Sequence, residues 1–213
     1  MPAPLMHIAL ALIALAGPFS RFDKKNFIVG TSFPDIRYPA GIPRNQTHAR
    51  PVLWNQKNLT AFQAGYLFHS WVDLLFEEYT NETGLMRRLP PIPYALQTLK
   101  IMADKKLYHM SKQVFGDIPA CFKTIIPEER VPGVKLHLVR EWHKKLTRYA
   151  AGHCFHPDGD FCLAKSDNAT LAKISAILAV TGEENDLVEQ VTHDFYRFTS
   201  QKIDTIRLPE AGK

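Results

Sequence analysis

Cysteine is scarce in this sequence, which contains only Cys121, Cys154 and Cys162 and no C-x-x-C motif or zinc-ribbon spacing. Three thiols are too few for a disulfide framework, although Cys154 and Cys162 are near enough in sequence to close one short loop. Reduced thiols in a reducing compartment are the simpler interpretation. Internal repeats and low-complexity tracts are also absent. With 46% apolar and 22% charged residues, the composition excludes a disordered, collagenous or coiled-coil chain.

A strong excess of one charge is missing as well. Lysine and arginine number 26 against 21 aspartates and glutamates, which leaves a net charge of +5. The positive residues are spread along the chain, so there is no strong nucleic-acid-binding signature. Such a balance permits an anionic partner or substrate. The 213 residues suffice to bury a core, and we expect one domain over residues 1–213.

No apolar run is long enough for a transmembrane helix, because the run Ile8–Ala16 is too short to cross a bilayer. Residues 14–16 resemble a signal-peptidase site, but the residues before them lack a basic n-region. An uncleaved N-terminus and a cytoplasmic location are therefore favoured. Secretion or export to the periplasm is the alternative if residues 1–16 are a signal peptide. Four N-x-[ST] triplets support that alternative, because this is the acceptor sequence for N-glycosylation in secreted proteins. They lie at Asn45, Asn58, Asn81 and Asn168.

The sequence also lacks the pattern of β-strands, since no segment alternates apolar and polar residues. We therefore predict an all-α fold. The clearest helix spans 58–80, with Asn58 or Thr60 as its cap and Asn81 and Gly84 at its end. Further helices are expected at 6–16, 93–115, 134–151, 168–180 and 184–200.

Residues 26–52 carry many helix breakers and are expected to form a long irregular segment. The breakers are Gly30, Pro34, Pro39, Gly41, Pro43 and Pro51. The apolar start of the segment, residues 27–29, indicates that it packs against the core. Loops are expected at 127–133 and 153–167, and the tail 206–213 is expected to be frayed.

The 58–80 helix carries the first candidate site. His69 and Asp73 are four residues apart and project from one face, and Glu77 continues the same row. Such a row can supply two or three ligands to a divalent ion. The helix is apolar on most sides, so the pair should be buried and needs a partner. A His–Asp hydrogen bond within the core is the alternative, and spacing alone favours it.

Three more polar residues are candidates for a functional site because of where they lie in the sequence. Asp35 follows a proline in the segment 26–52, His48 comes thirteen residues later, and His7 lies on the apolar N-terminal helix. Loops bring such groups to a rigid helical scaffold, where they can bind or react. Taken singly, each has a simpler interpretation: a turn residue, a surface histidine and a histidine at a helix end.

Taken together, these residues resemble the zinc-dependent phospholipase C and P1 nuclease superfamily, in its small bacterial phospholipase C-like branch. The resemblance rests on four sequence stretches: MHIA at 6–9, FIVGTSFPDIR at 27–37, RNQTH at 44–48 and AFQAGYLFHSWVD at 61–73. The order H…D…H…H-x3-D is the ligand order of the family. The resemblance covers roughly the first 80 residues, a little over a third of the chain.

The resemblance implies a helical bundle with metal ions between its helices. It implies one or two zinc ions, with His7, Asp35, His48, His69 and Asp73 as ligands. Asp35 and Asp73 are then the candidate catalytic residues, Asp73 as a bridge and Asp35 as a ligand or a base for the attacking water. The substrate would be an anionic phosphate ester, bound by Arg37, Arg44 and Arg50.

A third ion, which the full-length enzymes of the family hold, has no aligned ligand set in this sequence. Glu77, Asp104 and His109 are the candidates for further ligands or supporting residues. The step His137-x3-Glu141 has the family's later spacing but lies far downstream of Asp73. The other histidines of the second half are interpreted as surface residues: His143, His153 and His156.

The favoured function is a metal-dependent phosphoesterase that hydrolyses a phosphodiester or a phosphomonoester with metal-activated water. One alternative is a non-catalytic helical protein that uses bound metal structurally. Another is a metal-free helical binding protein. An HD-type phosphohydrolase ranks lower, because the doublet His193-Asp194 is followed only by Asp204.

Overall fold

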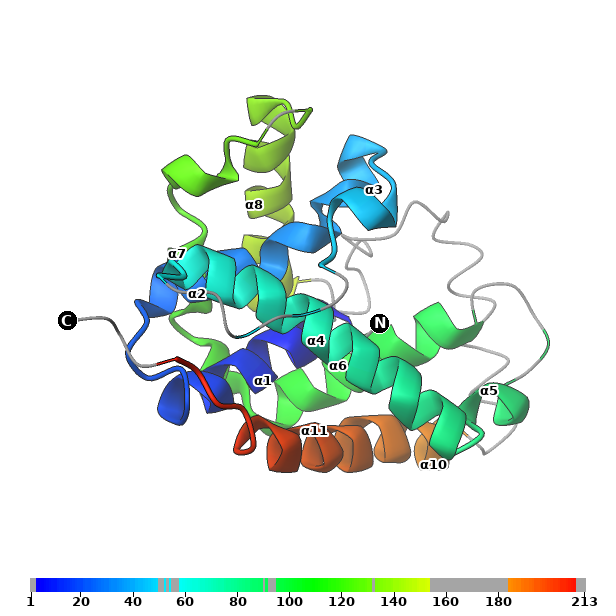
Figure 1. Cartoon of the computed structure of the whole chain (residues 1–213). Helices are drawn as coiled ribbons and strands as arrows, with labels where there is room; N and C mark the ends of the chain where they lie inside the picture. The colour runs from blue at the N-terminus through cyan, green and yellow to red at the C-terminus, as the bar shows by residue number, and fades with distance from the viewer. Residues whose placement is uncertain are drawn as a thin grey trace.

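The computed structural model describes residues 3–49, 52, 54, 58–89, 91, 95–131, 133–153 and 184–209. Within these residues the protein is all-α and contains no strand, which confirms the predicted fold class (Figure 1). The predicted helix at 168–180 lies outside the described residues. The same holds for Arg50, Cys154, Cys162, His156 and Asn168.

The helices follow one another with short connections. The first half forms α1 (Pro4–Ala16), α2 (Lys24–Ser32), the 3-10 helix η1 (Phe33–Ile36), α3 (Arg37–Ala40), the 3-10 helix η2 (Arg44–Gln46), α4 (Ala61–Glu82) and α5 (Leu85–Arg88). The second half forms α6 (Ala95–Met110), η3 (Lys112–Phe115), α7 (Ile118–Cys121), η4 (Pro127–Glu129), α8 (Leu136–Ala150), α10 (Glu184–Glu189), the π-helix η6 (Gln190–Asp194) and α11 (Phe195–Ile203).

Helix α4 is the long central helix that crosses the middle of Figure 1. Its start is fixed by a capping box, in which Thr60 Oγ1 accepts from the Gln63 amide at 3.2 Å and Gln63 Oε1 accepts from the Thr60 amide at 3.0 Å. Thr60 is thus the cap, one of the two predicted. The helix ends before Gly84, whose φ of 62° suits a residue without a Cβ.

Helix α2 packs on α4 with almost no side-chain layer between the two backbones. A Cβ on Gly30 would lie 2.1 Å from the carbonyl oxygen of Phe62, and a Cβ on Gly65 would lie 2.1 Å from that of Phe27. Only glycine permits this approach at either position. The crossing places the C-terminal half of α2 against the first turns of α4.

The prediction of an irregular segment over 26–52 was wrong for most of its length, because residues 24–46 are largely helical. Pro34 and Gly41 lie at helix ends, where they do no harm, and Gly30 lies inside α2, where its lack of a Cβ allows the contact with α4. The Asp23 carboxylate caps α2 by accepting from the Asn26 amide at 2.9 Å. Pro34 occupies the first turn of η1, which needs no amide hydrogen, and Gly41 ends α3 with a φ of 66°.

Helix α1 is enclosed by α2, α4, α6 and α11, all of which it contacts. Its residues from Leu5 to Ala11 are buried, so this apolar helix forms the centre of the core. The predicted frayed tail is also partly wrong. Ile206 is buried, and the Arg21 guanidinium donates to the carbonyl oxygen of Pro209 at 2.7 Å.

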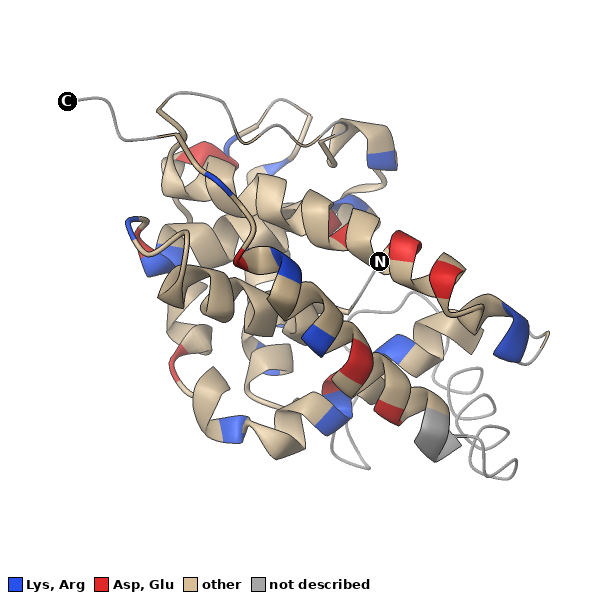
Figure 2. Ribbon diagram, turned by 60° about the horizontal axis from the view of Figure 1, so that its bottom comes forward, with Lys and Arg blue, Asp and Glu red and all other residues tan. Residues whose placement is uncertain are grey.

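No helix among the described residues combines the length and the apolarity that crossing a membrane requires. In the view of Figure 2, residues of both charges are scattered along the ribbon. This distribution agrees with the spread of charge in the sequence.

Candidate metal centre

Four separate segments bring five polar side chains to one place inside the protein. His7 comes from α1, Asp35 from η1, His48 from the residues after η2, and His69 and Asp73 from α4. All five are buried, with at most 7% of any of them exposed. The structure therefore brings together every residue that the sequence suggested as a principal ligand.

His69 has a defined orientation. Its Nδ1 lies 2.7 Å from the carbonyl oxygen of Thr31, which can only accept a hydrogen bond, so Nδ1 carries the proton. Nε2 of the neutral ring then presents a lone pair to the cluster. The close packing of α2 on α4 supplies this carbonyl, because Thr31 lies near the end of α2.

Three atoms that could ligate a metal ion form a compact triangle. They are Nε2 of His69, Nε2 of His48 and Oδ2 of Asp73. Nε2 of His69 lies 3.2 Å from Nε2 of His48 and 3.7 Å from Oδ2 of Asp73. Nε2 of His48 lies 3.2 Å from the same Oδ2. Zinc with four ligands at about 2.0–2.2 Å has ligand–ligand edges of about 3.3–3.6 Å. The triangle therefore has the dimensions of one face of a zinc tetrahedron.

Asp35 offers a fourth donor atom on this side. Its Oδ1 lies 3.9 Å from Nε2 of His69, and donor atoms of Asp35, His48 and His69 all lie within 4.8 Å of one another. Two imidazole nitrogens and two carboxylate oxygens make a mixed set that suits zinc and other first-row divalent ions.

The second oxygen of Asp73 faces a different donor. Oδ1 lies 3.2 Å from Nε2 of His7, whose ring stacks on that of His69 with centroids 4.0 Å apart and planes inclined by 6°. Donor atoms of His7, His69 and Asp73 also lie within 4.8 Å of one another. Because the Nε2 lone pair of His69 can bind only one ion, His7 and Oδ1 of Asp73 are the donors left for a second ion.

Several buried atoms of the cluster lack a hydrogen-bond partner among the described residues. They are Nδ1 and Nε2 of His7, Oδ1 of Asp35 and Oδ1 of Asp73, since the contact between His7 and Asp73 lacks hydrogen-bond geometry. A buried polar atom without a partner costs about 1–3 kcal/mol. A cation bound between these atoms would remove that cost.

The protonation states of His7, His69 and Asp73 suit metal ligation. Burial lowers the pKa of both His7 and His69 to about 4, so both rings are neutral near pH 7. Burial also raises the pKa of Asp35, and the charge of Asp73 raises it further. Burial opposes the ionisation of Asp73, but the surrounding imidazoles of His69, His48 and His7 outweigh it and hold its pKa well below the usual range.

The remaining ligand candidates lie outside this cluster. Asp104 instead holds the start of α1, because its oxygens accept from the amides of Leu5 at 2.7 Å and Met6 at 2.9 Å. It thereby positions the turn that carries His7. Glu77 and His109 are exposed on α4 and α6.

The predicted phosphate-binding arginines have different surroundings. Nη2 of Arg44 lies 2.5 Å from Oδ2 of Asp73, so this guanidinium is part of the cluster. Arg37 donates to the hydroxyl of Tyr38 at 2.7 Å and lies over its ring, 4.0 Å from the centroid. Arg50 is outside the described residues.

Lys100 is a residue of the site that the sequence analysis missed. It is only 8% exposed on α6, and its ammonium interacts electrostatically with Asp73 and Asp35. Burial lowers its pKa to about 8, and the two carboxylates oppose that shift. A signal existed, because Lys100 lies at helical spacing between the apolar residues Leu96 and Leu107.

A second buried acid–base pair was also missed. Nε2 of His143 lies 2.6 Å from Oε1 of Glu129, and Nδ1 of His143 donates to the carbonyl oxygen of Phe122 at 3.0 Å. Oε2 of Glu129 accepts from the Ile126 amide at 2.9 Å. The interpretation of His143 as a surface residue was therefore wrong, since it ties residues 122–129 to α8.

The other histidine motifs of the second half lie at the surface. His137 and Glu141, which have the spacing of a later ligand pair, are exposed on α8. In the HD-type doublet, the side chain of His193 is 42% exposed and contacts Glu189 at 2.9 Å. Asp194 is exposed as well. Neither motif contributes to the cluster.

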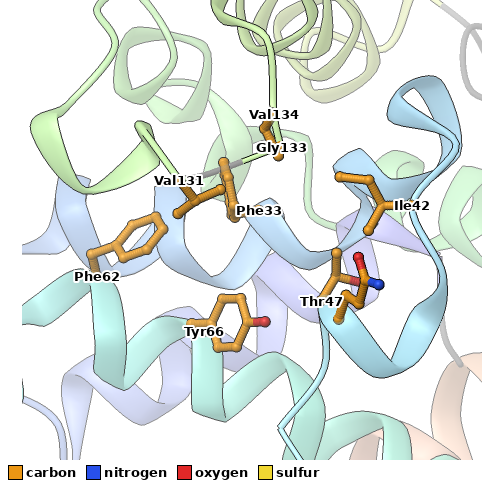
Figure 3. Close-up of a pocket in the computed structure, with 9 residues that line it drawn as sticks. Phe33, Ile42, Thr47, Phe62, Tyr66, Val131, Gly133 and Val134 are labelled. Carbon is orange, nitrogen blue, oxygen red and sulfur yellow. The ribbon is translucent and has the colours of Figure 1, made fainter.

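A pocket of about 400 Å³ lies beside the cluster (Figure 3). Most of its lining is apolar, and Thr47 connects it to the cluster because Thr47 Oγ1 lies 3.0 Å from Nδ1 of His48. Its lining residues come from η1, α4, the segment around η2 and the loop before α8: Phe33, Ile42, Gln46, Thr47, Phe62, Tyr66, Val131, Gly133 and Val134.

No protein-family model matches the chain, no curated protein is significantly similar to it, and no solved structure gives a significant match. The geometry of the cluster therefore carries the functional interpretation.

Proposed function

We propose that the protein binds a divalent metal ion, zinc in the first place, between His48, His69, Asp73 and Asp35, and hydrolyses a phosphate ester there. The observation that carries the proposal is the triangle of His48, His69 and Asp73 donor atoms, with edges of 3.2, 3.2 and 3.7 Å. At His69 the bond to Thr31 fixes the lone pair on Nε2, and this lone pair lies 3.7 Å from Oδ2 of Asp73, which is also an acceptor. A cation bound between these two acceptors would be attracted to both of them.

A second ion fits between His7 and the other oxygen of Asp73, which would make Asp73 a bridging carboxylate. Its two oxygens face the two donor sets, 3.2 Å from His7 and 3.2 Å from His48. The ligand order along the chain, which resembles that of the zinc-dependent phospholipase C and P1 nuclease superfamily, supports the same assignment.

Bound zinc supplies a Lewis acid and a water of lowered pKa. The residues of this chain supply the rest. Asp35 offers Oδ1 to the ion, 3.9 Å from Nε2 of His69, and its other carboxylate oxygen would accept a proton from the attacking water. Arg44 and Lys100 give the site positive charge, which suits an anionic substrate. The pocket that Thr47 links to His48 has apolar side chains, Phe33 and Phe62 among them, that would contact an apolar part of the ester.

The test combines metal content with hydrolysis. Tag-free wild type, His69→Ala and Asp73→Ala proteins are analysed by inductively coupled plasma mass spectrometry and assayed on an aryl phosphomonoester and an aryl phosphodiester with added zinc. We expect about one equivalent of zinc or more in wild type, its loss in both variants, and a fall in hydrolysis of at least about 100-fold. Glu141→Gln, a surface change, is the matched control. Full hydrolysis by both ligand variants would refute the proposal.

A structural metal is the second candidate, and one observation favours it. The ligands come from α1, η1, the segment after η2 and α4, so an ion would join four segments of the fold. Zinc that is retained and raises the melting temperature by several degrees, without hydrolysis of any phosphate ester, would select this alternative. A metal-free binding protein requires that zinc neither binds nor stabilises the chain.

A further inference from the structure

Arg44 occupies an unusual position for a residue that would bind a substrate. Its Nη2 lies 2.5 Å from Oδ2 of Asp73, which is the same oxygen that completes the triangle with His48 and His69. A guanidinium and a divalent ion cannot share this oxygen without repelling each other. Arg44 therefore stands where a bound ion would place its own charge.

The contact is made by one atom of the guanidinium rather than by its fork. Nε of Arg44 is buried without a hydrogen-bond partner among the described residues. Arginine binds carboxylates most strongly through two parallel hydrogen bonds, so a one-atom contact is the more easily exchanged form. The side chain of Arg44 is also 37% exposed, whereas that of Asp73 is 1% exposed. Arg44 thus reaches the cluster from the solvent side and has room to leave it.

The backbone near Arg44 is anchored independently of this contact. The Thr47 amide donates to the carbonyl oxygen of Arg44 at 3.0 Å, and the Ala49 amide donates to Oγ of Ser70 at 3.0 Å. The side chain of Arg44 can therefore swing outward while His48 stays in place.

We propose that Arg44 is an exchangeable counter-ion of the metal centre. In the metal-free protein its guanidinium neutralises Asp73, and a divalent ion displaces it from Oδ2. The released guanidinium, carried four residues before the ligand His48, then binds an oxygen of the oxyanion that the centre attracts. The inference rests on the proposed metal site and adds that binding of the ion and binding of the anion are coupled through one side chain.

The test measures zinc affinity by competition with a chromophoric chelator at low ionic strength. Arg44→Gln removes the competing charge, so its zinc affinity should rise about tenfold over wild type. Arg44→Lys keeps a positive charge and should stay closer to wild type. Arg37→Gln is the charge control from the same segment; its guanidinium is engaged with Tyr38, and its zinc affinity should change less than about twofold.

The second measurement is binding of inorganic phosphate to the zinc-loaded proteins by titration calorimetry. Arg44→Gln should bind phosphate at least about tenfold more weakly than wild type while binding zinc more tightly. The opposite signs separate an exchangeable counter-ion from a merely structural residue, whose removal would weaken both.

The outcomes distinguish the inference from the proposed function. If wild type and Arg44→Gln bind zinc equally, or if Arg44→Gln binds it more weakly, the exchange is refuted and the metal site stands. If no variant binds zinc, the metal site itself is refuted and the inference falls with it. If Arg37→Gln also bound zinc more tightly than wild type, the gain in zinc affinity would come from the lower net charge of the protein. That result would also refute the exchange.

Discussion

His69 donates its Nδ1–H to the carbonyl oxygen of Thr31 over 2.7 Å, and this bond directs the opposite ring nitrogen at Asp73. The bond joins α4 to the end of α2. It exists because Gly30 and Gly65 let the two helices touch backbone to backbone. The orientation of the central ligand is thus a consequence of helix packing.

Gly65→Ala should therefore damage both the fold and the site. A Cβ there would meet the carbonyl oxygen of Phe27 at 2.1 Å, so α2 must move away from α4. We expect a loss of about 1–3 kcal/mol in the free energy of unfolding, together with weaker zinc binding. Chemical denaturation and zinc titration measure the two effects. Gly116→Ala is the control, because its nearest atom would be 3.4 Å away. Unchanged stability of Gly65→Ala would contradict the backbone contact between α2 and α4.

His7→Ala should separate the two donor sets. Of the two oxygens of Asp73, His7 lies against Oδ1, while His48 and His69 lie against Oδ2. We expect its zinc content to fall from about two equivalents to about one, whereas His69→Ala loses the remaining ion as well. Mass spectrometry of the intact metal-loaded proteins under native conditions counts the ions. Two ions retained in His7→Ala would exclude His7 as a ligand.

Asp104→Asn should change how stability depends on pH. Burial raises the pKa of Asp104 to about 7 from an ordinary value of 3.8, against the opposing hydrogen bonds from Leu5, Met6 and Tyr149. The folded state therefore holds a proton that the unfolded state releases above pH 4. The contribution of Asp104 is fully present below about pH 4 and is lost as the pH rises towards 7.

Urea denaturation of wild type and Asp104→Asn from pH 4 to 8 provides the measurement. The difference in unfolding free energy between the two proteins should fall with pH by at most about 1.4 kcal/mol per unit and level off above pH 7. Other titrating groups are common to both proteins and cancel in this difference. A difference that stays constant over this range would exclude the raised pKa.

Removal of either partner of the pair Glu129–His143 should destabilise the protein strongly. Each partner is buried, and their contact is 2.6 Å long. Breaking such a pair costs about 3–5 kcal/mol, because the other partner is left buried without its partner. The double variant Glu129→Ala/His143→Ala should cost less than the sum of the single variants.

A double-mutant cycle measured by denaturation provides the coupling free energy. The surface pair Glu141 and Lys144, with an N–O distance of 2.8 Å, is the control, and Glu141→Ala should leave stability unchanged within error. Strict additivity in the buried cycle would mean that the two residues do not act as a pair.

Much of the fold followed from local signals in the sequence. The capping sequence at Thr60 and the helical spacing of apolar residues predicted α4 to within a few residues. The failure over 26–52 has a physical cause. Proline and glycine were counted as breakers, but their effect depends on where in a helix they lie, and Pro34 and Gly41 lie at helix ends.

Some polar residues of the core could be predicted from the sequence, and others could not. His69 and Asp73 were evident because helical spacing alone puts them on one face. Lys100 was overlooked, although its place between apolar residues was a signal. The partnership of Glu129 with His143 had no signal, because it joins a short 3-10 helix to α8 through tertiary contacts.

The sequence by itself determined the all-α class, the central helix and the pairing of His69 with Asp73, since these depend on residue type and on spacing within one helix. His7, Asp35 and His48 were suggested as ligands by the order of residues along the chain, through the family resemblance. Only the tertiary structure decided that His7, Asp35 and His48 lie beside His69 and Asp73, because that depends on how α1, η1 and α2 pack on α4. It also decided that Arg44 contacts Asp73 whereas Arg37 contacts Tyr38. Both arginines belong to the segment 26–52, and only the path of the folded chain distinguishes them.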